Sequence, residues 1–351
     1  MNGKILTWLS MLPRNGKLKH FYAFKYENLE KLWNKDLEEL EFLKDVNRKF
    51  YNAIFDETIR KNAERAFEVA VNSGIEVISI MSELYPPLLK ETADAPAVLF
   101  YKGDIVRCIN CISVIGSRKA TAYGLKAAED ISAELSRKGA CIVSGLARGI
   151  DSKAHKAAIK ANGSTCAIIG CGIDVVYPPE NEMLYREISA NGVIISEYAP
   201  GIPPLPQNFP ARNRIISGIS QGIVVIEAGK ESGTLITVDF ALEQGRDVFA
   251  VPGNIYSLKS IGTNNLIKEG AKMVMDAEDI AEEYDFLKSK SKISGLREYI
   301  IESLESGFFE REEIERITGI NTKEINIELM EMMLEGILGK CENGEYFLLK
   351  K

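Results

Sequence analysis

The sequence predicts an α/β fold built on a doubly wound parallel sheet, preceded by a small helical domain and followed by another small domain. Three observations support this. Short, uninterrupted apolar runs alternate with amphipathic stretches between residues 112 and 285. Leucines recur at helical spacing in residues 1–75. A charged, serine-rich stretch near residue 286 separates the C-terminal segment, and the 351-residue length fits two or three domains.

Residues 1–75 are expected to form the helical N-terminal domain. Leu29, Leu32 and Trp33 are spaced as on one face of a helix, and Asn72-Ser-Gly74 is typical of a helix end. A connector follows, in which Tyr85-Pro-Pro87 predicts a stiff turn and Ala97–Tyr101 a short strand.

Six apolar runs in the central segment are expected to be buried strands. They are Ile112–Ile115, Ala140–Val143, Cys166–Ile169, Val193–Ile195, Ile223–Ile226 and Val248–Val251. Helices are expected between them, as in Ala122–Arg137, Lys153–Lys160 and Leu235–Glu243. Continuously apolar strands separated by helices are typical of a parallel sheet covered on both faces. Residues 76–285 are therefore predicted to form an extended Rossmann-like domain.

The C-terminal segment is predicted to be a linker followed by a winged-helix-like domain. Residues 286–294 form the linker and residues 295–351 the domain. Its three expected helices lie at Leu296–Leu304, Ile314–Ile317 and Ile325–Leu338. The dipeptide Asn343-Gly344 predicts the turn of a terminal hairpin.

Charge is distributed unevenly along the chain. The net charge is −7, and residues 291–351 carry 8 Lys and Arg against 13 Glu, which leaves only −2 for the other 290 residues. A nucleic-acid binder that works by global positive charge is disfavoured, but a local basic site outside the tail is allowed. No secretory signal or apolar run of about 18 residues is visible, so we expect a cytoplasmic protein without a membrane span.

Metal and cofactor chemistry is not expected. The chain has two His, which lie far apart, and six Cys. Cys108-Ile-Asn-Cys111 has the CxxC spacing of a zinc ligand pair, but no second pair follows. We therefore expect buried or scattered reduced thiols.

Common catalytic motifs are missing from the central segment. No GxGxxG follows the first strand, and no Gly-Lys pair is followed by Ser or Thr, which disfavours a dinucleotide dehydrogenase and a P-loop motor. His155 is the single histidine of the sheet segment, and no Ser-His-Asp set can be assembled around it. We expect no catalytic residues and no cofactor.

Four loops at predicted strand ends carry small, hydroxyl or basic residues. In chain order the candidate binding residues are Gly116, Ser117, Arg118, Ser144, Gly145, Arg148, Phe209, Arg212, Asn213, Arg214, Ser232, Gly233 and Thr234. Glycines let a backbone approach an anion, helix starts such as Ser232-Gly-Thr234 attract phosphate, and arginine forks match it. Asp151 is a natural cap for the helix after the second loop.

Each of these loops, taken alone, is more often an ordinary strand-to-helix turn, because short motifs match by chance. Together they fall on the edge of the sheet where this type of fold binds ligands. They predict a phosphate-lined groove with a stacking ring at Phe209, which suits single-stranded nucleic acid. Nothing in the set reads base edges, so binding should be independent of sequence.

The same segments resemble the DNA-processing protein A (DprA/Smf) family over residues 80–285. The matching strings include Ser113-Val-Ile-Gly-Ser-Arg118, Val143-Ser-Gly-Leu-Ala-Arg-Gly-Ile-Asp151, Phe209-Pro-Ala-Arg-Asn-Arg-Ile-Ile216, Ser232-Gly-Thr-Leu-Ile-Thr237 and Val248-Phe-Ala-Val-Pro-Gly253. The resemblance implies a single-stranded DNA-binding protein that loads the RecA recombinase onto DNA taken up in natural transformation.

The resemblance also implies a homodimer as the working form, and apolar residues in Leu258–Ile267 could serve it. It implies that Arg118 is a main DNA contact, that Phe209–Arg214 is a second, and that the N-terminal helices are SAM-like. A winged-helix tail also occurs in the family. Here the −5 charge of the tail favours a protein-contact or regulatory role over duplex binding.

An enzyme is the competing interpretation. Nucleoside-monophosphate phosphoribohydrolases of the lysine-decarboxylase-like (LOG) group are similar in having a Gly-Thr phosphate turn, which is followed by a catalytic Glu. Here Thr237 stands where that Glu is expected. Glu227 and Glu243 are the remaining candidate acids, and we expect structural roles for both.

Overall fold

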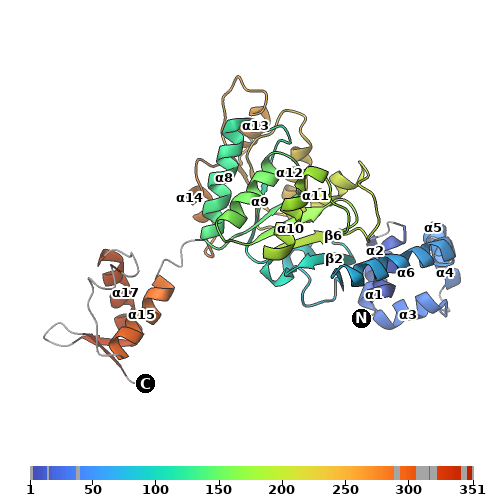
Figure 1. Cartoon of the computed structure of the whole chain (residues 1–351), viewed down its shortest axis with the longest axis horizontal. Helices are drawn as coiled ribbons and strands as arrows, with labels where there is room; N and C mark the ends of the chain where they lie inside the picture. The colour runs from blue at the N-terminus through green and yellow to red at the C-terminus, as the bar shows by residue number, and fades with distance from the viewer. Residues whose placement is uncertain are drawn as a thin grey trace. The chain divides into compact units, whose positions relative to one another are not determined.

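The computed structural model describes residues 3–13, 16–36, 40–287, 293–305, 316, 322–340 and 346–349. These residues belong to two compact units, Met1–Glu283 and Tyr284–Lys351 (Figure 1). The helical segment 1–75, expected as a domain of its own, lies within the first unit. The break between the units is close to the predicted start of the linker at residue 286.

The first unit begins with six helices, as predicted from the leucine spacing. They are α1 (Gly3–Met11), α2 (Gly16–Phe24), α3 (Tyr26–Asn34), α4 (Leu40–Val46), α5 (Arg48–Ile54) and α6 (Glu57–Asn72). Trp8 and Trp33 pack edge to face with ring centroids 5.3 Å apart, and Leu29 is fully buried beside them in the same core. Helix α1 packs against α6 and against the first two strands, which joins the helices to the sheet.

Nine strands form one sheet in the order β1-β2-β6-β5-β4-β3-β7-β8-β9. Their bounds are β1 Glu76–Ser79, β2 Val98–Gly103, β3 Cys111–Ile115, β4 Cys141–Ser144, β5 Thr165–Ile169, β6 Val193–Ser196, β7 Gly222–Val225, β8 Asp247–Ala250 and β9 Lys272–Met273. All six predicted strands are confirmed to within a residue at each end. The predicted parallel sheet is confirmed, because β3 to β8 all pair in parallel, and the connector adds an antiparallel edge in which β1 pairs with β2 and β2 with β6.

The helices between the strands are α8 (Ala122–Arg137), α9 (Ile150–Lys160), α10 (Glu182–Asn191), α11 (Asn208–Ile219), α12 (Gly233–Glu243) and α13 (Ile261–Lys268). Short helices also occur at α7 (Pro87–Lys90) and α14 (Glu278–Ala281), with 3₁₀ turns at Ile105–Arg107 and Pro179–Asn181.

The direction of the chain across the sheet reverses between β3 and β7. From β3 to β6 each strand is added on the same side of its predecessor, and then β7 pairs with the free side of β3. Right-handed crossovers therefore place α8, α9 and α10 on one face, where they pack on one another, and α11 and α12 on the opposite face. The loops after β3 and β7 diverge, which opens a crevice at the carboxyl ends of these strands.

One expected loop is helical. Residues 208–214, assigned to a strand-end loop from the sequence, form the first half of α11. Pro210 is compatible with this because proline is tolerated in the first turn of a helix, where the backbone amides have no partner within the helix. The consequence is that successive side chains of this segment point in different directions.

The second unit contains α15 (Ile293–Glu305), α17 (Thr322–Leu334) and an antiparallel pair, β10 (Leu338–Lys340) with β11 (Tyr346–Leu348). Its small core includes Leu296, Ile300, Leu329 and Met332. The expected helix at 314–317, apart from Arg316, and the turn at 343–344 lie outside the described residues, so the winged-helix assignment stays a prediction.

No helix within the described ranges is both long and apolar enough to cross a membrane.

The five described cysteines are buried, as one part of the expectation of buried or scattered thiols has it, but three of them lie together. The sulfur atoms of Cys108, Cys111 and Cys141 all lie within 4.8 Å of one another. Cys111 and Cys141 are paired in the register of β3 and β4, a proximity that local spacing in the sequence does not reveal.

His155 on α9 is a buried titratable residue that makes the stability of the fold depend on pH. Its Nδ1 lies 2.7 Å from Oγ1 of Thr165, whose hydroxyl donates to the carbonyl of Ile142, so Nδ1 carries the proton that it donates. The buried Nε2 has no hydrogen-bond partner among the residues that the structure describes. Burial, aided by the positive charge of Arg212, lowers the pKa of His155 from 6.5 to about 3.

We predict that His155 makes the protein less stable in acid. The unfolded chain binds a proton near pH 6.5 and the folded chain only near pH 3, so stability is lost as pH falls below 6.5. Between about pH 7.5 and 5.5 the free energy of unfolding should fall by about 1 kcal/mol more in wild type than in His155→Asn. Denaturant titrations at both pH values measure this, and equal losses in the two proteins would contradict it.

Candidate nucleic-acid interface

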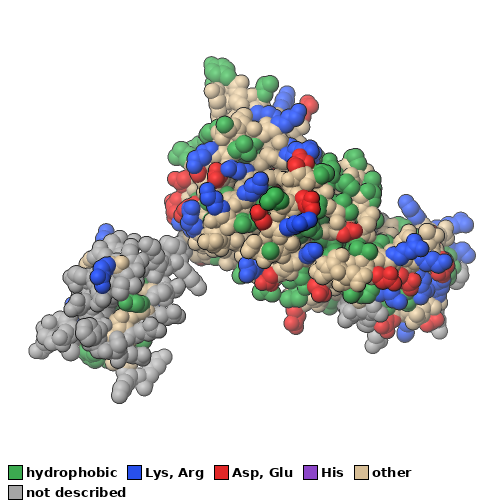
Figure 2. Space-filling view, viewed as in Figure 1, with side chains coloured by type: hydrophobic (Ala, Val, Ile, Leu, Met, Phe, Trp, Pro, Cys, Tyr) green, Lys and Arg blue, Asp and Glu red, His purple; other side chains and the backbone are tan. Residues whose placement is uncertain are grey.

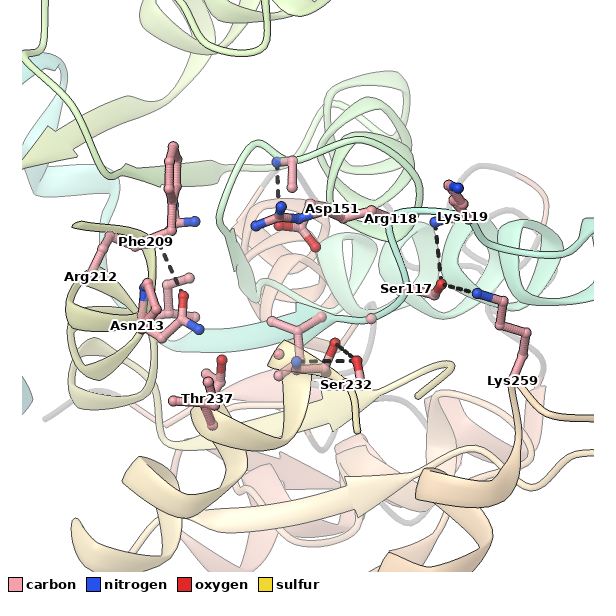
Figure 3. A pocket seen from close by; sticks show the side chains of 18 residues that line it. Ser117, Arg118, Lys119, Asp151, Phe209, Arg212, Asn213, Ser232, Thr237 and Lys259 are labelled. Atoms are coloured by element: carbon pink, nitrogen blue, oxygen red, sulfur yellow. Dashed lines mark hydrogen bonds between the residues drawn. The ribbon is translucent and has the colours of Figure 1, made fainter. Parts of the chain in front are cut away.

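A cavity of about 430 Å³ lies in the crevice at the carboxyl ends of the strands (Figure 3). Loops after five strands contribute to it. Its lining residues are Ile115, Gly116, Ser117, Arg118, Lys119, Ala147, Asp151, Phe209, Pro210, Arg212, Asn213, Ile216, Ser232, Gly233, Thr234, Ile236, Thr237 and Lys259. The cavity thus occupies the topological switch point where this class of sheet binds ligands.

The loop after β3 supplies Gly116, Ser117 and Arg118, as predicted. A Cβ on Gly116 would approach Cγ1 of Ile150 to 2.7 Å, so only glycine lets this loop pack against α9. Ser117 Oγ accepts hydrogen bonds from the amide of Lys119 at 3.2 Å and from Lys259 Nζ at 3.4 Å. The exposed Arg118 places its guanidinium 5.9 Å from the centre of the Phe209 ring. The hydroxyl of Ser117 and three cationic side chains therefore lie on one side of the cavity; the cations are Arg118, Lys119 and Lys259.

The start of α12 forms the opposite side, with Ser232, Gly233 and Thr234. Ser232 caps the helix, because its Oγ accepts from the amide of Thr234 at 3.2 Å. Apart from the neighbouring residues and the backbone of the helix itself, no atom of the described residues lies within 4 Å of the position that a Cβ on Gly233 would take, so the backbone there is open to a ligand. The first amides of a helix, together with its dipole, make this end attractive to an anion.

Helix α11 contributes Phe209, Arg212 and Asn213. The ring of Phe209 is half-buried and lies 5.4 Å from that of Tyr177. Arg212 is 4% exposed, and its Nη1 donates to the carbonyls of Gly145, at 2.9 Å, and Ile168. Burial lowers the pKa of Arg212 to about 10, so it remains a cation at neutral pH in the floor of the cavity.

Arg214, predicted as a binding residue, lies outside the cavity and forms ion pairs within the protein. It is not among the lining residues. Its Nη2 donates to both carboxylate oxygens of Glu197 at 2.7 Å, and its Nε lies 3.3 Å from Asp94. Because the segment is helical, Arg214 points away from the face that carries Phe209 and Asn213.

The loop after β4 is also placed differently from the expectation. Ser144 is fully buried, and its Oγ donates to the carbonyl of Val114 at 2.7 Å instead of facing the cavity. The amide of Gly145 donates to Asp151 at 3.1 Å, so it is not available to a phosphate. Arg148 is exposed and forms an ion pair with Glu180, beside a small adjoining cavity that Arg118 and Phe209 also line.

Asp151 is not the N-cap of α9, which is Gly149 in the left-handed region at φ 78°. Asp151 lies in the first turn of the helix, and its carboxylate accepts hydrogen bonds from the amides of Gly145 and Ala147. Burial raises its pKa, against the lowering effect of Arg212 and these amides. Asp151 therefore holds the β4–α9 loop in shape, and it also lines the cavity.

Lys119 and Lys259 were missed by the sequence reasoning. Lys119 adjoins the predicted loop, and Lys259 comes from the segment between β8 and α13. A single lysine in a loop carries no motif, so only the fold shows that Lys259 faces Ser117. No described acidic side chain forms an ion pair with Arg118, Lys119 or Lys259, which leaves these cations available to an anion.

The acids that an enzyme would need are positioned for other roles. Glu227 is buried and accepts from the amide of Thr121 at 2.9 Å and from its hydroxyl at 2.5 Å. Glu243 is exposed at the end of α12 and does not line the cavity. Among the described lining residues Asp151 is the only carboxylate. Its cations and the start of α12 therefore equip the cavity to hold an anionic ligand.

Comparisons with known proteins identify relatives. The family described as DNA recombination-mediator protein A matches residues 76–285. DNA processing protein DprA of Streptococcus pneumoniae is 46% identical over 209 residues, which are 59% of this chain and 74% of that protein. The protein of the same name from Bacillus subtilis is 46% identical over 212 residues, 60% of this chain and 71% of that protein.

Two solved structures are also similar. The X-ray structure of DprA from S. pneumoniae has a TM-score of 0.70 and 36% identity, covering 81% of this chain and 99% of that one. The structure of DNA processing protein A from Helicobacter pylori, described for its single-stranded DNA binding mode, has a TM-score of 0.54 and 28% identity. It covers 59% of this chain and 93% of that one.

We predict that Glu227 holds the β3–α8 loop in place. In Glu227→Ala the amide and hydroxyl of Thr121 lose their acceptor, which should cost about 1–3 kcal/mol in the free energy of unfolding. Glu243→Ala, an exposed control, should change it by less than about 0.5 kcal/mol. Denaturant titration compares them, and equal effects would show that the Thr121 contact contributes nothing.

Proposed function

The chain belongs to the DNA recombination-mediator protein A family, and on that premise we propose that it binds single-stranded DNA in the crevice between β3 and β7. The observation that carries the proposal is the lining of the cavity. Ser117 and the start of α12 face each other across it, and Arg118, Lys119 and Lys259 supply positive charge.

A phosphate of the strand would lie between Ser117 and the first amides of α12. Lys259 is already directed to this point, because it donates to Ser117 Oγ. Arg118 would contact the next phosphate, since its guanidinium forks match phosphate oxygens. Each of these contacts reaches the backbone of the strand and none reaches a base edge, so binding is independent of sequence.

Phe209 would stack a base beside these phosphates. Its ring lies between Tyr177 and Arg118 at the edge of the cavity and is half-buried, so one part of it is held and another is accessible. Stacking on an aromatic side chain tolerates every base, because each base has a π-face.

Two further proposals rest on the family. We propose that the bound strand is handed to a RecA-type recombinase in the cytoplasm, and that the chain works as a homodimer. The segment after β8 supports an interaction surface, because Ile255, Tyr256 and Leu258 are at least three-quarters exposed. In the second unit, Met330 and Leu334 on α17 are also exposed, which fits a protein-contact role better than duplex binding.

We predict that Arg118→Ala weakens binding to oligothymidylate about tenfold and makes its salt dependence shallower by about 0.7 in log-log slope, because one phosphate contact is lost. Arg186→Ala is the charge-matched control, since Arg186 is exposed and pairs with Glu182 on α10, outside the cavity. Salt titrations of single- and double-stranded DNA measure both. An unchanged slope in Arg118→Ala would remove Arg118 from the interface.

We predict a different result for Phe209. Phe209→Ala should weaken binding by about 1–3 kcal/mol through lost stacking, with the salt slope unchanged, because no charge is removed. Phe209→Trp should retain most of the affinity. If Phe209→Ala binds like wild type at every salt concentration, the ring packs against the protein alone and does not stack on a base.

A further inference from the structure

A cluster of buried cysteines lies at the amino ends of the strands, at the opposite edge of the sheet from the crevice. Cys111 begins β3 and Cys141 begins β4. Cys108 lies in the turn just before β3 and is 6% exposed, and the other two are 2% and 1% exposed. The Sγ atoms of Cys108 and Cys111 are 3.5 Å apart, and all three lie within 4.8 Å of one another.

The strand register fixes this convergence. Cys111 and Cys141 are partners in the parallel β3–β4 pair, so their side chains point to the same face. Cys166 on β5 is the partner of Val143, two residues after Cys141, and therefore points to that face as well. It is the face covered by α11, because Ser113, two residues after Cys111, donates to the carbonyl of Ile216.

Cys166 lies beside the cluster, although its sulfur is not one of the three that lie within 4.8 Å of one another. It is fully buried, and its thiol interacts with the sulfur of Cys108. Three buried thiols therefore converge under α11 with a fourth beside them, and cysteine sulfur is among the ligands that zinc prefers.

We propose that Cys108, Cys111 and Cys141, with Cys166 as the fourth ligand, form a closed binding site for one Zn²⁺ ion. Zinc prefers four tetrahedral ligands, and thiolates bind it at about 2.3 Å, which places neighbouring sulfurs about 3.8 Å apart. The sulfurs of Cys108 and Cys111, 3.5 Å apart, are close to that separation, and no pair within the trio is farther apart than 4.8 Å. On binding, each ligating thiol releases its proton to solvent and no electron is transferred.

The position of the site defines its role. It would tie the turn that carries Cys108 to the first residues of β3, β4 and β5, and so hold together the amino ends of the strands whose carboxyl ends form the crevice. Ile109, next to Cys108, is 62% exposed, so this turn provides a short route from solvent to the buried sulfurs. The site is structural in type, since protein sulfurs would fill every ligand position.

The test is the metal content of the full chain. Protein purified with a thiol reductant is stripped, supplied with Zn²⁺ alone, dialysed and analysed by elemental mass spectrometry. Wild type should hold about one zinc per chain, and Cys111→Ser and Cys141→Ser less than about a tenth of that. Cys171→Ser is the matched control, because Cys171 is a buried cysteine outside the cluster whose thiol donates to the carbonyl of Val175. It should bind zinc like wild type.

A second measurement on wild type alone guards against variants that fail to fold. Replacing Zn²⁺ with Co²⁺ should produce thiolate-to-cobalt charge-transfer absorption and the intense visible bands of tetrahedral cobalt. Wild type without bound zinc or this spectrum would overturn the proposal. Equal zinc content in wild type and in folded Cys111→Ser and Cys141→Ser would also overturn it. So would a metal-free chain with two free thiols fewer than its six cysteines, because this would indicate a Cys108–Cys111 disulfide instead.

Discussion

The reversal of strand order between β3 and β7 is the constraint on which the rest of the first unit depends. The helices before the reversal lie on one face of the sheet and those after it on the other. The loops after β3 and β7 therefore separate and leave a crevice. Glu227, at the end of β7, binds Thr121 at the start of α8 and thereby fixes the two sides of the reversal to each other. A Cβ on Gly124 would lie 2.4 Å from the Glu227 carboxyl carbon, so this contact also requires glycine there.

Electrostatics at the crevice is local and does not follow the overall charge of the chain. The net charge is −7, and Figure 2 shows Lys and Arg mixed with Asp and Glu over the visible surface. The crevice instead combines a buried cation, Arg212, with exposed side chains of the same sign and the start of α12. Fixed dipoles and few charges in a narrow site can hold a phosphate backbone without a broad basic surface. The overall acidity of the chain is therefore compatible with the proposed binding of single-stranded DNA.

The sequence was sufficient to predict the sheet and part of the site, and the residues show where it stops being sufficient. Ser117 and Arg118 could be predicted because a glycine turn that directly follows a buried strand lies at the carboxyl edge of the sheet, where this fold binds ligands. The position of Arg214 outside the cavity could not be predicted. The proline-flanked segment gives no sign of the helix that directs Arg214 toward Glu197. Lys259 and Cys141 meet their partners only through pairings between strands distant in sequence, which local spacing does not encode.

The central claim is that a single strand of DNA occupies the crevice between β3 and β7 through its phosphates. A crystal structure of the full chain with oligothymidylate tests it most directly. The account predicts a phosphate within hydrogen-bond distance of Ser117 Oγ and the first amides of α12, a second phosphate on Arg118, and a base against Phe209. An oligonucleotide bound on another surface, with the crevice filled only by solvent, would contradict it.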